Sequence, residues 1–279
     1  MIILVNKATK LSDAFLKLPK EYMAQIQFGI ETDTLDIEGR IISQKDTAGL
    51  SINNINEVLS RFKGPIKQIP PMYSALKYNG KPLYKIARTG RSVERKTRDV
   101  KISCIEARDF DGHILTIKVC CSSGTYIRTL ASDIGKILGT GAVLHGLERS
   151  RIGEFRLERS VKFKEIPDIK KINAPIENNG IAISIEGLLR NNPSIFIKAG
   201  YEKAIINGKR ISPGMIDFGK TDARGFSDLA KNSGQDFSGM VLVKDFCGCI
   251  LAVHGIIEKI KPDDARSLEQ EFTKSIVIF

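Results

Sequence analysis

The stretch ILTIKVCCSSGTYIRTLASDIGKILG, residues 114–139, contains the clearest structural pattern in the chain. Its first part, Ile114 to Cys121, is rich in β-branched and apolar residues and predicts a strand. After Gly124, apolar residues recur at helical spacing, and Gly139 supplies a common helix end. The apolar residues of this helical stripe are Ile127, Leu130, Ala131, Ile134, Ile137 and Leu138. The stretch therefore predicts a strand followed by an amphipathic helix.

Two further periodic segments lie nearer the N-terminus. Between Tyr22 and Ile30, apolar and polar residues alternate with period two, as in a half-buried strand. From Ser51 the spacing becomes helical, with Ser51 as the predicted N-cap and Gly64-Pro65 as the stop. Strands and helices thus mix without a regular βαβ rhythm. We expect an α+β fold with a mixed, largely antiparallel sheet flanked by helices.

The character of the sequence changes beyond this core. Residues 166–193 are rich in Lys, Asn and Pro and predict a linker. Short strand patterns separated by glycine-containing turns follow in residues 194–279, which is typical of a small β-rich module. We therefore predict a first domain over residues 1–165, a linker over 166–193 and a second domain over 194–279.

The composition is that of an ordinary globular protein with a strong basic excess. The 279 residues carry a formal charge of +11, which favours a polyanionic partner such as nucleic acid. The alternative is a charge that only aids solubility. Five cysteines, without a second pair at metal-ligand spacing, predict buried thiols in a reducing compartment and no metal site. The first ten residues resemble neither a signal peptide nor a membrane span, so a cytoplasmic location and no membrane are expected.

One segment combines aromatic and basic residues at high density. In PPMYSALKYNGKPLY, residues 70–84, three tyrosines alternate with lysines, and Arg88 follows soon after. Basic groups neutralise phosphates and aromatic faces stack on exposed bases, so we expect RNA contact here. The candidate residues are Tyr73, Lys77, Lys81 and Arg88. The alternative is a solvated basic surface whose tyrosines pack into the core.

A cation stands at the start of the helix predicted in the opening stretch. Arg128 falls in its first turn, where the macrodipole is positive and a cation is disfavoured. Such an arginine needs an anion nearby, either a carboxylate or a phosphate, unless it points into solvent. Two other polar segments stand out: GIETDTLDIEG, residues 29–39, where side-chain bonds can stabilise a turn, and LERSRIGEF, residues 147–155.

Together and in this order, four segments resemble the bacterial tRNA pseudouridine synthase B family. They are the run at 29–39, the segment PPMYSALKYNGKPLYKIAR at 70–88, GTYIRTL at 124–130 and LERSRIGEF at 147–155. The resemblance covers residues 1 to about 160. It implies a pseudouridine synthase core followed by a PUA-like RNA-binding module. It also implies isomerisation of uridine 55 in the T loop of tRNA, without a cofactor, after the base is flipped out. The partner implied is the T-arm of tRNA, and we expect a monomer.

The resemblance also assigns roles to residues. Tyr22 matches the family's catalytic tyrosine, which packs against the base and is implicated in removing its proton. Arg128 matches the catalytic arginine that pairs with the nucleophilic aspartate. Tyr126 and Leu147 match residues that line the uracil pocket, and Arg149 lies in the same basic segment as Leu147.

The family's nucleophile lies in a G-x-L-D-x-x-A-x-G run just upstream of the segment matching Ala8–Leu11, and residues 1–279 contain no such run. Asp36 belongs to the downstream motif and is not assigned as nucleophile. We therefore expect that this chain is an N-terminally truncated synthase and that it is inactive alone. We also expect the reading frame upstream of Met1 to encode a GxLDxxAxG segment. In this form Arg128 is expected to lack its carboxylate partner. The alternative is a non-catalytic tRNA-binding or tRNA-folding module.

Overall fold

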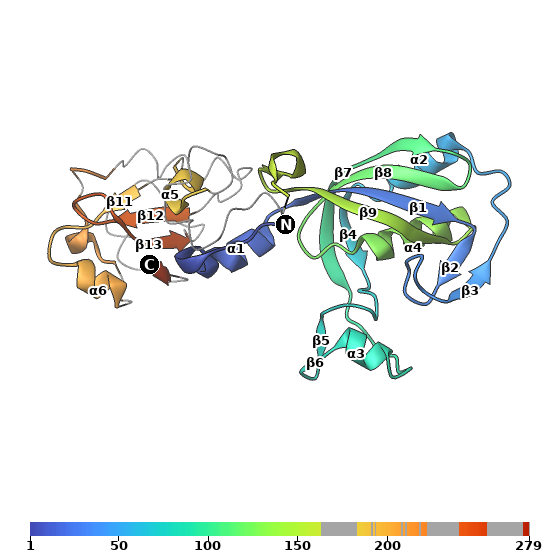
Figure 1. The fold of residues 1–279 in the computed structure, drawn as a ribbon, viewed down its shortest axis with the longest axis horizontal. Coiled ribbons are helices and arrows are strands. Elements are labelled where there is room, and N and C mark those ends of the chain that lie inside the picture. Colours follow the sequence, from blue (N-terminus) through green and yellow to red (C-terminus); the bar gives the residue numbers. More distant parts are fainter. Residues whose placement is uncertain are drawn as a thin grey trace. The chain divides into compact units, whose positions relative to one another are not determined.

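The computed structural model describes residues 1–162, 183–190, 192, 194–207, 209, 211–217, 219–221, 240–255 and 276–278. The chain forms two compact units (Figure 1). One comprises Lys17–Glu158, and the other comprises Met1–Leu16 together with Arg159–Phe279. Most of the predicted linker, 166–182 with 191 and 193, lies outside the described residues, so the domain limits at 165 and 193 stay predictions.

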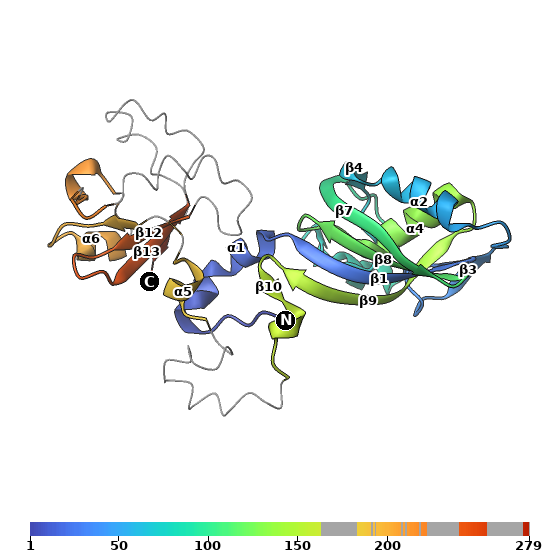
Figure 2. The ribbon, with the colours of Figure 1, turned by 90° about the horizontal axis from the view of Figure 1, so that it is seen from above.

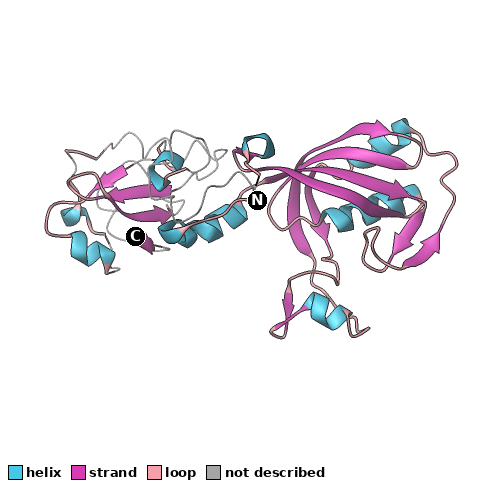
Figure 3. Cartoon of the chain, viewed as in Figure 1, coloured by secondary structure: helices cyan, strands magenta, loops and turns pink. Residues whose placement is uncertain are grey.

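The unit Lys17–Glu158 is built on one six-stranded sheet with the order β10-β9-β1-β8-β7-β4. All neighbouring strands in this sheet run antiparallel. The strands are β1 (Lys20–Phe28), β4 (Gly64–Gln68), β7 (Arg98–Phe110), β8 (Ile114–Cys121), β9 (Ala142–Ile152) and β10 (Phe155–Arg156). The expectation of an α+β fold with a largely antiparallel sheet is confirmed (Figure 3).

Two helices cover one face of this sheet, α2 (Ile52–Ser60) and α4 (Ile127–Leu138) (Figure 2). Along β8 every second residue is buried, so one side of the strand enters the core, as the sequence pattern predicts. Ser51 caps α2 through its hydroxyl, which accepts a hydrogen bond from Asn54 N at 3.3 Å. Gly139 ends α4 with a left-handed backbone, φ 79°. Apolar side chains from both helices and from the inner face of the sheet form one core.

Two smaller substructures extend from the sheet. A hairpin of β2 (Ile30–Thr32) and β3 (Ile41–Gln44) follows β1. Between β4 and β7, a separate insertion holds β5 (Lys77–Tyr78), β6 (Lys81–Pro82) and α3 (Leu83–Ala87), and it projects from the end of the sheet in Figure 1. The short helix η2 (Leu157–Arg159) follows β10.

The other unit begins with η1 (Asn6–Leu11) and α1 (Ser12–Lys17), the last residue of which falls in the first unit. Its four-stranded sheet has the order β11-β12-β13-β14, with β11 parallel to β12 and the rest antiparallel. The remaining elements are β11 (Ser194–Phe196), β12 (Met240–Lys244), β13 (Ile250–Gly255), β14 (Ile276–Ile278), α5 (Ile185–Leu188), α6 (Glu202–Ile206) and η6 (Pro213–Met215). This sheet has its own apolar core. Its assignment as a PUA-like module stays a prediction.

Within the described part of the chain, no helix combines the length and apolar character needed to span a membrane.

Candidate active site

Arg128 is paired with a carboxylate. Its Nη1 lies 3.0 Å from Asp36 Oδ2, and both side chains are partly buried, with 32% and 25% exposed. The expectation that Arg128 lacks a carboxylate partner is therefore wrong. The partner is 92 residues away in the sequence, in the turn between β2 and β3, and no sequence pattern links the two. An ion pair explains how a cation is held in the first turn of a helix against the macrodipole.

The backbone of the loop holds Asp36 beside β9. Ile37 N donates to Leu144 O at 2.9 Å, and Leu144 N donates to Leu35 O at 3.1 Å. Thr34 Oγ1 donates to Asp36 Oδ1, which orients the carboxylate. A Cβ on Gly39 would lie 2.2 Å from Thr34 Oγ1, so glycine lets the loop close this tightly. The loop is thus a turn stabilised by its own side chains, and it also presents a carboxylate to α4.

Gln68 was missed by sequence reasoning. It is the last residue of β4, and only 1% of it is exposed. Its Oε1 accepts from Tyr126 N at 3.0 Å, and its Nε2 donates to Tyr126 O at 3.3 Å. A signal was available, since alternation along β4 places Gln68 on the same side as Ile66, and a polar residue at an inward position needs buried partners.

Tyr22 lies on β1 with its side chain packed against the core. It stands opposite Arg149 on β9, so both side chains project from the same face of the sheet. Burial raises the pKa of Tyr22, while the neighbouring Arg149 opposes this rise. Leu147, 50% exposed, stands opposite Ala24 on the same face. The structure therefore brings Tyr22, Leu147 and Arg149 to one side of the β1–β9 pair.

The predicted RNA contacts lie on the insertion between β4 and β7. Lys77, Lys81 and Arg88 are exposed, and Tyr73 is half-buried just before the insertion's hairpin. The Arg88 guanidinium stands over the Tyr84 ring, 5.7 Å from its centroid. The idea that the tyrosines here all pack into the core is wrong for Tyr78, which is 43% exposed.

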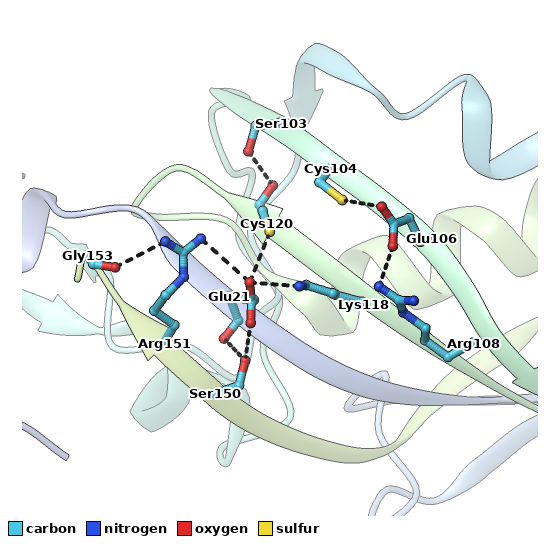
Figure 4. Close-up of polar contacts among 10 residues, drawn as sticks. All are labelled: Glu21, Ser103, Cys104, Glu106, Arg108, Lys118, Cys120, Ser150, Arg151 and Gly153. Carbon is cyan, nitrogen blue, oxygen red and sulfur yellow. Dashed lines mark hydrogen bonds and ion pairs between the residues drawn. The ribbon is translucent and has the colours of Figure 1, made fainter. Parts of the chain in front are cut away.

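A second polar cluster occupies the opposite face of the sheet (Figure 4). Its centre is Glu21, whose side chain is 13% exposed and whose carboxylate lies 3.1 Å from Lys118 Nζ and 3.5 Å from Arg151 Nη2. Ser150 Oγ donates to Glu21 Oε1 at 2.9 Å. Burial alone would raise the pKa of Glu21, but these hydrogen bonds and the lysine charge outweigh it and hold the pKa below its usual value. Because Glu21 precedes Tyr22 on one strand, its side chain points to the other face of the sheet. There it links neighbouring strands and is not part of the candidate active site.

Among the described residues, no three His, Cys, Asp or Glu side chains are placed to hold a metal ion.

Comparison with known proteins places this chain in the class of pseudouridylate synthases. The model of the TruB family pseudouridylate synthase (N terminal domain) matches residues 1–127. The tRNA pseudouridine synthase B of Endomicrobium trichonymphae is 44% identical over 172 residues, covering 62% of this chain and 75% of that relative. The chain therefore belongs to the TruB family.

Other relatives agree with this assignment, and a solved structure has a similar fold. The tRNA pseudouridine synthase B of Bordetella avium (strain 197N) is 51% identical over 163 residues, covering 58% of this chain and 67% of the relative. The tRNA pseudouridine synthase B of Francisella tularensis subsp. novicida (strain U112) is 48% identical over 168 residues, which cover 60% of this chain. The chain spans only 56% of the length of that relative. An archaeal box H/ACA sRNP Nop10-Cbf5 complex matches 96% of this chain and 71% of its own, with TM-score 0.57 and 20% identity, which supports the fold.

Proposed function

We propose that this chain is the tRNA-binding and base-binding part of a tRNA pseudouridine synthase that isomerises uridine 55 in the T loop. The observation that supports this most strongly is the Arg128–Asp36 pair at the start of α4, in a chain 44–51% identical to proteins named tRNA pseudouridine synthase B. The proposal includes a cytoplasmic monomer that acts on the T-arm without cofactor or metal.

The reaction breaks the bond between N1 of uracil and the ribose C1′, turns the base, and joins its C5 to C1′. The C5 proton is then removed, a step in which Tyr22 would take part, and N1 gains a proton, so that product and substrate are isomers. The uridine must first leave the stack. Tyr22 would pack against the flipped base, and Tyr126 and Leu147 would line the pocket around it. With its pKa raised by burial, the Tyr22 phenol is protonated at neutral pH, which favours packing against an uncharged base.

Arg128 can hold more than one carboxylate. A guanidinium carries five N–H donors, and the pair with Asp36 uses one of them. A nucleophilic aspartate could therefore share Arg128 with Asp36, and the ion pair would hold the arginine in place before that aspartate binds. Since residues 1–279 contain no G-x-L-D-x-x-A-x-G run, we propose that these residues alone are inactive and that activity depends on a polypeptide segment supplying this run.

The remaining candidates would hold the RNA. Lys77, Lys81 and Arg88 would neutralise phosphates, Tyr73 would contact the RNA at the base of the insertion, and Arg149 would contact RNA beside Tyr22. Such contacts predict affinity for tRNA whether or not the chain is catalytic, so binding cannot distinguish an enzyme from a tRNA-folding module.

The test compares three proteins in tritium release from tRNA labelled at C5 of uridine. The first is residues 1–279, the second adds a segment with the family pattern GxLDxxAxG before Met1, and the third replaces the aspartate of that segment with asparagine. We expect tritium release and pseudouridine at position 55 only with the second protein. If the second protein binds tRNA but forms no pseudouridine, the tRNA-folding function is correct instead.

A further inference from the structure

The N-terminus of α4 lacks the usual local stabilisation. Its N-cap residue, Tyr126, makes no side-chain capping hydrogen bond, and no acidic residue stands in the first turn. The first turn instead contains a cation, Arg128, which the helix dipole disfavours. Because α4 begins where two proposed site residues lie, something outside the helix must hold this end in place.

Gln68 contacts the residue before the helix, whose carbonyl oxygen also accepts the helical hydrogen bond from Leu130 N at 3.0 Å. Its carboxamide accepts from Tyr126 N at 3.0 Å and donates to Tyr126 O at 3.3 Å, so it binds both polar groups of one residue. A two-point contact restricts rotation of the backbone as well as its displacement. Gln68 is almost fully buried, so neither bond competes with bulk water.

A second contact joins the same two segments without touching Tyr126. Thr129 Oγ1, on the first turn of α4, donates to Ile69 O at 3.4 Å. Thr129 is also buried, with 5% exposed. The two neighbouring polar contacts therefore hold different residues. Gln68 holds Tyr126, the residue just before the helix, and Thr129 holds the first turn of the helix.

We propose that Gln68 is a positioning residue of the uridine site, which acts by fixing the backbone of Tyr126 and so the direction in which Tyr126 and Arg128 project. This proposal rests on the proposed function, in which Tyr126 lines the pocket for the base and Arg128 binds the nucleophilic aspartate. Gln68 itself touches neither RNA nor the reacting atoms in this scheme. Its loss should therefore affect base selection more than overall RNA affinity.

The first measurement tests the hydrogen bonds independently of function. The chain has six tyrosines, so labelling tyrosine with ¹⁵N gives few amide signals, and Tyr126→Phe identifies that of Tyr126. In Gln68→Met, which keeps side-chain length but removes both polar groups, we expect the Tyr126 amide to exchange with solvent roughly fivefold faster or more. Thr129→Val, the matched control, should leave this rate unchanged. An unchanged rate in Gln68→Met would overturn the proposal.

The second measurement tests the role in base binding. The probes are two T-arm hairpin RNAs that differ only in uridine or cytidine at the target position, and the readout is the ratio of their Kd values. We expect a preference for uridine in the native chain, a loss of about threefold or more of that preference in Gln68→Met, and no loss in Thr129→Val. A purely structural role would lower the melting temperature of both variants and leave the ratio unchanged, which would also overturn the proposal.

A conservative variant completes the test. Gln68→Glu retains one acceptor but, when ionised, cannot donate to Tyr126 O; its protonated form has one donor and one acceptor, as a carboxamide does. The uridine preference of this variant should therefore recover as the pH falls towards 5, while that of Gln68→Met stays low. If the native chain shows no uridine preference although the Tyr126 amide responds to Gln68→Met, the proposed function fails and Gln68 is only structural.

Discussion

At the scale of single residues, the site depends on polar side chains whose partners are distant in sequence. Arg128 is held by Asp36, and Asp36 is in turn held by Thr34 and by the backbone contacts of its loop to Leu144. A partly buried charged side chain, such as that of Arg128, stays in position only if its oppositely charged partner is also held in position. Substitutions at these residues should therefore change the site without unfolding the sheet.

Asp36→Asn should remove the charge that holds Arg128 while preserving the shape of the loop. In the protein extended with the GxLDxxAxG segment, we expect the rate of pseudouridine formation to fall by about tenfold or more, since a loss of one charge-assisted hydrogen bond is worth about 1.5–3 kcal/mol. Tritium release measures this. Asp33→Asn, in the same loop but exposed, with its carboxylate accepting from Arg40 N, should keep most of the activity. Equal losses in both variants would contradict the role of Asp36.

Glu21→Gln should destabilise the sheet in a pH-dependent way. The folded state holds the pKa of Glu21 below its ordinary value of 4.5, so its stabilising effect is present above that value and is lost as the pH falls through the lower, folded-state pKa. At pH 7 we expect the variant to lose about 1–3 kcal/mol, because Lys118 and Arg151 lose their anion. Urea unfolding at pH 7 and near pH 3 measures the difference, which should shrink at acid pH. Glu57→Gln, at an exposed pair with Arg61, should show little effect at either pH.

At the scale of elements, the helix predicted from the opening stretch forms as expected, but its approach to the sheet depends on one glycine. Gly135 is buried on the face of α4 that packs against the loop leading into β9. A Cβ there would lie 2.3 Å from Ala142 N and 2.4 Å from Gly141 C. Both atoms belong to the backbone and cannot rotate away, so the glycine sets how close α4 lies to β9.

Gly135→Ala should therefore destabilise the protein, although alanine favours helices. The gain in helix propensity is about 1 kcal/mol. The overlap with backbone forces α4 away from the sheet, and such overpacking costs about 1–3 kcal/mol or more. We expect a net loss of stability in urea unfolding. Lys136→Ala, at the next, exposed position, should change stability by less than about 0.5 kcal/mol. A Gly135→Ala protein more stable than the native one would show that the backbone can shift freely.

At the scale of the whole molecule, the exposed basic residues of the insertion lie outside the apolar cores that stabilise the fold. The formal charge of +11 belongs to a chain that folds as two units, each with its own core. Basic residues of the insertion stand away from the six-stranded sheet of their own unit and remain exposed (Figure 1). They can therefore bind RNA phosphates without contributing to the core.

Replacing Lys77, Lys81 and Arg88 with alanine should weaken tRNA binding and make it less sensitive to salt. If each residue neutralises one phosphate, the slope of log Kd against log salt should fall by about 2 to 3. Titrations of tRNA at several KCl concentrations measure the slope. The charge-matched control replaces Lys7, Lys17 and Lys63, three exposed lysines outside the insertion. An equal fall in slope for both variants would mean that the net charge, not the insertion, binds the RNA.

The sequence by itself determined the local elements and the family. Apolar periodicity predicted β1, β8, α2 and α4, because burial of one face follows from spacing along the chain. Ordered motifs placed the chain among tRNA pseudouridine synthase B proteins, as the comparisons confirmed. Only the tertiary structure decided the strand order and the partners of Arg128 and Tyr126. Those partners, Asp36 and Gln68, are 92 and 58 residues away, and such contacts depend on strand order and register, which periodicity does not specify.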